Sequence, residues 1–279
     1  MKKTLLLFAI AAVLLVGCKK DDQSSPEKKP AAKDMSGCLG YAAGYSNSGT
    51  IGPVNTFDFK IAQNNQFFAE EVTNQRNFWL GIPADVHVLY ETSADYKNAY
   101  ATTDGNILFG YQMFYYLVSS FSKLPGTNTL SPLPVDGVLA HEWGHRVQFT
   151  VGWTDYGQPS ERELEADFFS GYYMGLAKQW LWGQIKTYYS AIYASGDYYY
   201  NSPSHHGTPQ QRLNAAYSGL TVAVYELNNN VHYTYAQLHS IFKSKLTSEI
   251  SIKHGEQFAE VSYPKHLTTE NIKRLYPKL

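Results

Sequence analysis

The chain has 279 residues, enough for one large domain or two small ones. Hydrophobic residues make up 44% of it, charged residues 17%, and its formal net charge is −1, which excludes a largely disordered protein. With 23 Lys and Arg against 24 Asp and Glu, nothing in the charge balance attracts phosphates, so we expect no nucleic-acid partner. Two cysteines are too few for a disulfide-rich scaffold.

The N-terminal segment predicts export and lipidation. Two lysines precede an apolar run from Leu5 to Val16, too short to cross a bilayer and typical of a secretory signal. Gly17 and Cys18 follow, in a pattern that resembles a bacterial lipobox. We expect a cleaved signal peptide over residues 1–17 and lipid on Cys18, which anchors an exported bacterial lipoprotein to a membrane of the cell envelope, facing the periplasm or the cell surface. The alternative is an ordinary signal peptide followed by a chance cysteine.

The residues after the signal peptide predict a tether and a single domain. Residues 18–36 are polar, charged and proline-containing, as in a flexible tether. Residues 37–279 contain no second linker and no repeat, so we expect one domain there. If Cys18 is lipidated, Cys38 has no intrachain partner, and we interpret it as a small buried hydrophobic residue.

Hydrophobic spacing predicts the elements of this domain. In chain order we expect a helix over residues 61–79, a strand over 84–90, an extended segment over 98–109 with a turn at Asp104-Gly105, a helix over 112–121, a loop over 131–134, and helices over 136–150, 160–182, 210–227 and 235–246. Ser160 and Glu163 form a possible capping box at the start of the helix over 160–182. Strands come early and helices late, which favours an α+β fold.

Residues 141–145 read His-Glu-Trp-Gly-His, the spacing of a metal-binding helix. Four residues make just over one turn, so His141 and His145 project from one face and can share a metal ion. Glu142 lies about 100° further round the helix, where it can reach a water molecule without occupying a coordination position. Gly144 costs the helix about 1 kcal/mol relative to alanine, which indicates a close neighbour there. Apolar residues on both sides of the motif indicate that the histidines point into the interior.

A catalytic zinc ion needs a third protein ligand and one open position for water. Four acidic residues within seven positions open the next predicted helix and are the obvious donors. Glu163 and Asp167 share one face, and Glu161 and Glu165 share another. Acidic residues also complement the dipole of a first turn, which accounts for Glu161 and in part for Glu163, but less well for Asp167 among its apolar neighbours. We expect Asp167 to hydrogen-bond a ligand histidine, while spacing leaves Glu161, Glu163 and Glu165 open as the third ligand.

These motifs resemble the gluzincin zinc metallopeptidases, the family of HtpX and the CAAX prenyl protease, and are similar to the bacterial neutral zinc metallopeptidases. The segments that match, in order, are residues 98–101 with 105–107, 138–145, 163–167 and 206–212. Together they extend over a little under half of the mature domain. The chain differs in having no transmembrane helices beside the motif and in having Gly207 where many relatives have proline.

The resemblance implies a helix-rich zincin-like domain of the α+β class with a small sheet and one Zn²⁺ per chain. The zinc ligands that it implies are His141, His145 and Glu163. It also implies Glu142 as the general base, Asp167 as a support for a ligand histidine, His206 near the cleft in contact with the oxyanion, and Arg212 as the partner of buried acids.

We therefore expect a zinc metalloendopeptidase that hydrolyses a peptide or protein substrate outside the cytoplasm with an activated water molecule. The extended segment over 98–109 is the expected edge strand, which would align the substrate by backbone pairing. The alternative is a non-catalytic or holdase-type binding lipoprotein that retains the fold. The intact motif argues against this alternative, because a protein without activity has no chemical need for all of these residues.

Overall fold

The computed structural model describes residues 35–37, 49–94, 97–121, 133–185, 206–251 and 258–264. Every element named below belongs to the unit Lys33–Leu279. The predicted signal peptide, Cys18, most of the predicted tether and Cys38 lie outside the described residues. Within the described residues, no helix is long and apolar enough to span a membrane.

Five short strands form a mixed sheet in the order β1-β4-β5-β3-β2. Their bounds are β1 Met35–Gly37, β2 Gly49–Ile51, β3 Asp85–Glu91, β4 Ala99–Thr102 and β5 Asn106–Gly110. β3 and β5 are parallel, and the other neighbouring pairs are antiparallel. β4 and β5 form a hairpin around Asp104-Gly105, where the sequence predicts a turn.

β4 is not an edge strand, and the sequence-based expectation was wrong on this point. β1 pairs along the other side of β4, with Ser36 opposite Ala101. A strand of three residues contains no period long enough to distinguish it from a loop, so the sequence pattern did not reveal β1. Within the described part of the chain, the strands at the two edges of the sheet are therefore β1 and β2.

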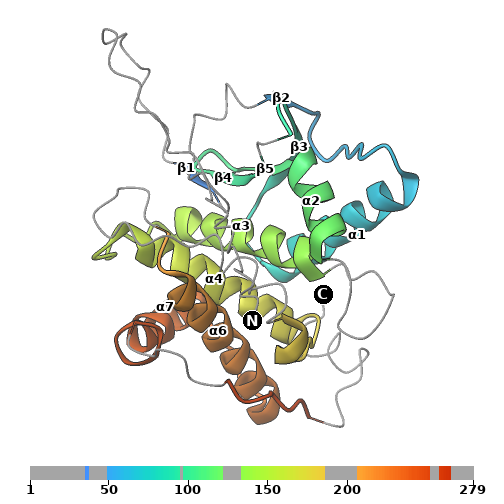
Figure 1. Cartoon of the computed structure of the whole chain (residues 1–279). Coiled ribbons are helices and arrows are strands. Elements are labelled where there is room, and N and C mark those ends of the chain that lie inside the picture. The colour runs from blue at the N-terminus through green and yellow to red at the C-terminus, as the bar shows by residue number, and fades with distance from the viewer. Residues whose placement is uncertain are drawn as a thin grey trace, which may run out of the picture. The chain divides into compact units, whose positions relative to one another are not determined.

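Helices make up most of the other described residues. Their bounds are α1 Ala62–Phe78, α2 Tyr111–Phe121, α3 Leu133–Val151, α4 Pro159–Leu176, α6 Pro209–Asn229 and α7 Tyr235–Lys245, after which a π-helical turn spans Leu246–Ile250. Figure 1 shows α3 between the sheet and α4, and α6 packed on the other side of α4. The helix-rich α+β class with a small sheet is confirmed.

Two helix ends differ by more than two residues from those expected. α3 begins at Leu133 and includes Pro134, which the sequence analysis assigned to a loop. Proline is tolerated there because the first turn of a helix does not use its backbone N–H groups. α4 ends at Leu176 rather than at residue 182, and Gln179 soon afterwards has a left-handed φ of 53° that no helix can continue through.

The expected capping box of Ser160 and Glu163 does not form. The N-cap position of α4 is occupied by Gln158, whose side chain makes no capping hydrogen bond. Glu163 faces the interior instead. Capping boxes do begin α6 and α7, in the pairs Thr208–Gln211 and Thr234–Gln237. Both follow the Thr-x-x-Gln pattern, so the sequence contained a signal for them.

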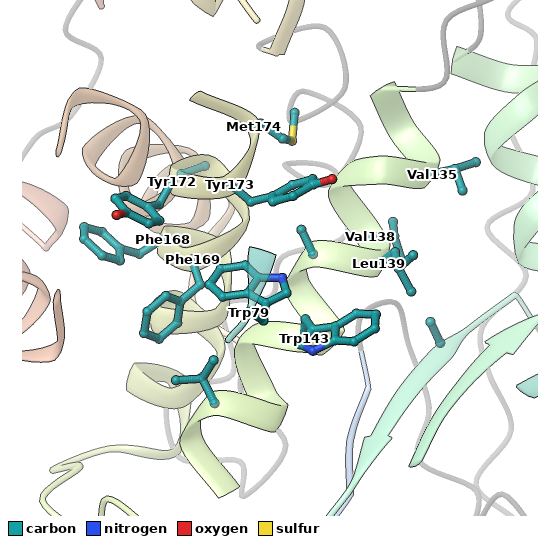
Figure 2. Packing of buried hydrophobic residues seen from close by; sticks show 14 of the residues in the cluster. Trp79, Val135, Val138, Leu139, Trp143, Phe168, Phe169, Tyr172, Tyr173 and Met174 are labelled. Carbon is teal, nitrogen blue, oxygen red and sulfur yellow. The ribbon is translucent and has the colours of Figure 1, made fainter. Parts of the chain in front are cut away.

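Large buried side chains fix α3 against α4 (Figure 2). Trp143 on α3 and Phe169 on α4 are fully buried, and the ring of Trp79 meets Phe169 edge-on at 5.9 Å between centroids. Gly144 lets the two helices approach closely, because a Cβ added there would lie 3.0 Å from the Cα of Ala166. The close neighbour that Gly144 predicted is therefore α4, and this contact brings the acids of α4 next to the histidines of α3.

Candidate metal centre

Three buried side chains that could hold a metal ion meet between α3 and α4: His141, His145 and Glu163. Their ligand atoms all lie within 4.8 Å of one another. The two Nε2 atoms are 3.1 Å apart, and each is 3.5 Å from a different carboxylate oxygen of Glu163. Nitrogen ligands of a tetrahedral zinc ion are about 3.3 Å apart, given Zn–N bonds of about 2.05 Å, so the group fits such an ion.

The structure distinguishes the acids that spacing left open. Glu163 faces the two histidines, whereas Glu165 faces His239 on α7, with 2.6 Å between Oε1 and Nδ1. Glu161 forms an ion pair with Lys243 at 2.7 Å. Of these three glutamates, only Glu163 is part of the group that could hold a metal ion.

A buried ion pair orients His141. Oδ1 of Asp167 lies 2.9 Å from Nδ1 of His141, and Arg212 on α6 donates to both oxygens of Asp167 at 2.7 and 2.9 Å. Burial disfavours the charged form of His141, but its bonds with Asp167 and Glu163 outweigh burial and raise its pKa to about 9. Because a carboxylate can only accept a hydrogen bond, Nδ1 of His141 carries the proton that points at Asp167. Nε2 is then the nitrogen that faces the other ligands.

His145 has a neutral partner instead. Its Nδ1 lies 2.9 Å from Oε1 of Gln148, and burial lowers the pKa of His145. Two imidazole lone pairs that face each other at 3.1 Å would repel, so a proton or a metal ion must lie between the Nε2 atoms of His145 and His141. Gln148 was not among the residues predicted from the sequence, although its spacing of three residues from His145 places both on one helical face.

Glu142 lies in the interior beside this group. Among the residues that the structure describes, neither of its carboxylate oxygens has a hydrogen-bond partner that meets ordinary geometry. Burial raises the pKa of Glu142 to about 8, although the charge of His141 and the backbone amide of Ala101 in β4 oppose this rise. Arg146, one helical turn after Glu142, holds this part of α3 against the end of β4 by donating to the carbonyl of Thr102 at 2.6 Å. A buried carboxylate without a close partner is suited to contact a water molecule or a substrate.

His206 lies just before α6, and its charge acts on Glu163. Burial raises the pKa of Glu163, but the charge of His145, hydrogen bonds to the two histidines and the charge of His206 hold it well below its usual value. The next residue, Gly207, has a φ of 87°, which proline cannot adopt. This backbone conformation accounts for the glycine where many gluzincins have proline.

Comparisons with known proteins add no family assignment. No protein-family model, curated protein or solved structure matches the chain. The resemblance to the gluzincins therefore rests on the motif residues themselves. What the structure adds to them is a buried His-His-Glu group, held between two helices of an α+β fold, that could hold a metal ion.

Proposed function

We propose that the chain is a zinc metallopeptidase of the gluzincin type with a zincin-like domain. The observation that carries the proposal is the buried carboxylate of Glu142, which has no close hydrogen bond within the described residues and lies beside a group that could hold a metal ion. Three protein ligands leave one position of a four-coordinate zinc ion open, as catalytic centres require. The N-terminal motif supports an exported lipoprotein that is attached to a membrane through Cys18.

The ligand set fits zinc, which when bound supplies Lewis acidity toward water and the scissile carbonyl. Glu142 accepts a proton from the attacking water and delivers it to the leaving amine. Asp167 keeps the proton of His141 on Nδ1, so that Nε2 is available as a ligand. His206 acts on the same site and donates a hydrogen bond to the carbonyl oxygen of the substrate as negative charge develops there.

Replacing Glu142 with glutamine tests the mechanism, because the amide keeps the shape of the side chain but cannot accept the proton. We expect Glu142→Gln to retain about one zinc per chain and to hydrolyse peptides about 10²- to 10⁴-fold more slowly. Glu161→Gln is the matched control, since Glu161 pairs with Lys243 away from the ligands. Elemental analysis and a peptide cleavage assay give the two readouts.

Each failure of this experiment has a separate meaning. Full activity of Glu142→Gln would exclude the mechanism, and a folded wild-type chain that takes up no zinc would exclude the metal centre. A chain that binds zinc, cleaves nothing and still suppresses client aggregation in the Glu142→Gln form would favour the holdase alternative.

β4 is the strand proposed to align the peptide. The backbone amide of Ala101 in this strand comes close enough to Glu142 to lower its pKa, so a peptide along β4 would lie beside the general base. β1 pairs with this strand at Ser36, so a peptide can pair on that side only when β1 leaves. Ser36→Pro removes a backbone N–H from β1 and weakens its pairing by about 1 kcal/mol, so we expect kcat/KM to rise about fivefold. Ala32→Pro, before β1, is the control, and equal rates for both variants would mean that the peptide does not use this side of β4.

A further inference from the structure

A chain of hydrogen bonds leads from His145 toward the surface, and it begins at an amide whose orientation is determined. Nε2 of Gln148 lies 2.8 Å from the carbonyl oxygen of Arg162 and 3.0 Å from Oε2 of Glu165. Both of these atoms can only accept, so the amide nitrogen belongs there and Oε1 must face His145. Gln148 therefore accepts a hydrogen bond from Nδ1–H of His145. Nε2 of that ring then carries the lone pair that faces the metal centre.

Glu165 is the next member of the chain. Its carboxylate is fully buried and accepts hydrogen bonds from three side chains: Gln148, Tyr156 and His239. Such a carboxylate is stable in the interior only when donors surround it, and donors from three sides also fix its position. The position of Glu165 determines in turn where the amide of Gln148 can lie.

His239 links the buried carboxylate to the surface. Nδ1 lies 2.6 Å from Glu165, and Nε2 lies 3.0 Å from Oδ1 of Asp155, whose side chain is 60% exposed. The ring stacks on Trp153 with 4.2 Å between centroids. Contacts at both nitrogens and on one face leave the imidazole a single orientation.

We propose that Gln148, Glu165 and His239 are positioning residues that hold His145 in the tautomer that binds the metal ion. This proposal rests on the metal centre of the proposed function and deepens it. His141 receives its orientation from a carboxylate that it contacts directly, whereas His145 receives it from three side chains in series, one of them on α7. Partners of this kind change metal affinity about 10- to 100-fold when they are removed.

A second histidine–glutamate pair in the protein provides a control for His239. His232 also meets a buried glutamate, with 3.3 Å between its Nδ1 and Oε1 of Glu226, and the other carboxylate oxygen of Glu226 accepts from Tyr172, a residue outside the group that could hold the metal ion. Loss of a histidine–glutamate contact as such would lower the Tm of either variant. A positioning role lowers the zinc affinity as well, and only in the His239 variant.

The experiment measures the Kd for Zn²⁺ of the full chain by chelator competition, together with the Tm of the metal-free form. We expect His239→Leu to weaken zinc binding about 10- to 100-fold and His232→Leu to leave it unchanged. Equal zinc affinity of His239→Leu and the wild type would overturn the positioning role while leaving the metal centre intact. Absence of zinc binding in the wild type would overturn both.

An exchange of charge keeps the proposal testable if His239→Leu does not fold. Gln148→Glu places a second carboxylate against Glu165 and removes the donor between them, so we expect weaker zinc binding. Adding Glu165→Gln restores one donor and one acceptor between the two positions, and we expect most of the zinc affinity to return. A double variant that binds zinc no better than Gln148→Glu alone would contradict the proposed series of hydrogen bonds from Gln148 through Glu165.

Discussion

The two histidines of the candidate metal centre lie one helical turn apart but are supported in opposite ways. His141 is held by an ion pair of Asp167 and Arg212, which are both fully buried. His145 is held by a neutral amide, from which hydrogen bonds lead out to an exposed carboxylate. Burial acts on both rings, yet the pKa of His141 is raised and that of His145 is lowered. The carboxylate of Asp167 at Nδ1 raises the pKa of His141, whereas burial and the charge of His141 both lower the pKa of His145.

The ion pair on the His141 side should matter most for folding. Arg212→Leu leaves the carboxylate of Asp167 buried with His141 as its partner, and removing one member of a buried pair costs about 3–5 kcal/mol. We expect the free energy of unfolding of the metal-free protein to fall by that amount in urea titrations. Arg162→Leu, at a half-buried position on α4, is the control and should change it little. Equal effects of the two variants would show that the buried pair contributes no more to stability than an arginine that lies over aromatic rings at a half-buried position.

The two sides also differ in how far the sequence could predict them. Helical spacing was sufficient to place His141 and His145 on one face and Glu142 beside them, and the burial of Asp167 followed from its apolar neighbours. The choice of Glu163 over Glu165 was not available from spacing, because it depends on the rotation of α4 relative to α3. The resemblance supplied that choice, and it also supplied Arg212.

The His145 side was largely invisible in the sequence. His239 and Glu165 are far apart along the chain and meet only because α7 packs near α4. No local pattern contains such a contact, whereas the i,i+3 spacing of Gln148 did contain a usable signal. β1 escaped notice for a different reason: it consists of three residues, so its strand conformation depends on pairing with β4 rather than on its own composition.

A change at the helix contact should affect both histidines together. Gly144→Ala places a Cβ 3.0 Å from the Cα of Ala166, a backbone atom that can move only if α4 moves. α4 carries both Glu163 and Asp167, so we expect weaker zinc binding and a loss of about 1–2 kcal/mol in the free energy of unfolding, typical of overpacking. Calorimetry with and without zinc measures both effects. Unchanged zinc affinity would mean that the backbone of α4 makes room for the added methyl group without moving Glu163 relative to the two histidines.

The smallest effect concerns pH and the His145 side alone. Burial disfavours protonated His239, but its bonds to Glu165 and Asp155 outweigh burial and raise its pKa, while Lys243 on the same helix contacts the carbonyl of Asp155. A raised pKa in the folded state stabilises the protein fully below about pH 6.5, and this stabilisation is lost as the pH rises through the raised value. We therefore expect the Tm of the metal-free wild type to fall more between about pH 6 and pH 8 than that of His239→Gln. Parallel Tm curves would mean that the ring is neutral when folded and donates to Glu165 alone, so that Asp155 would not belong to the support of His145.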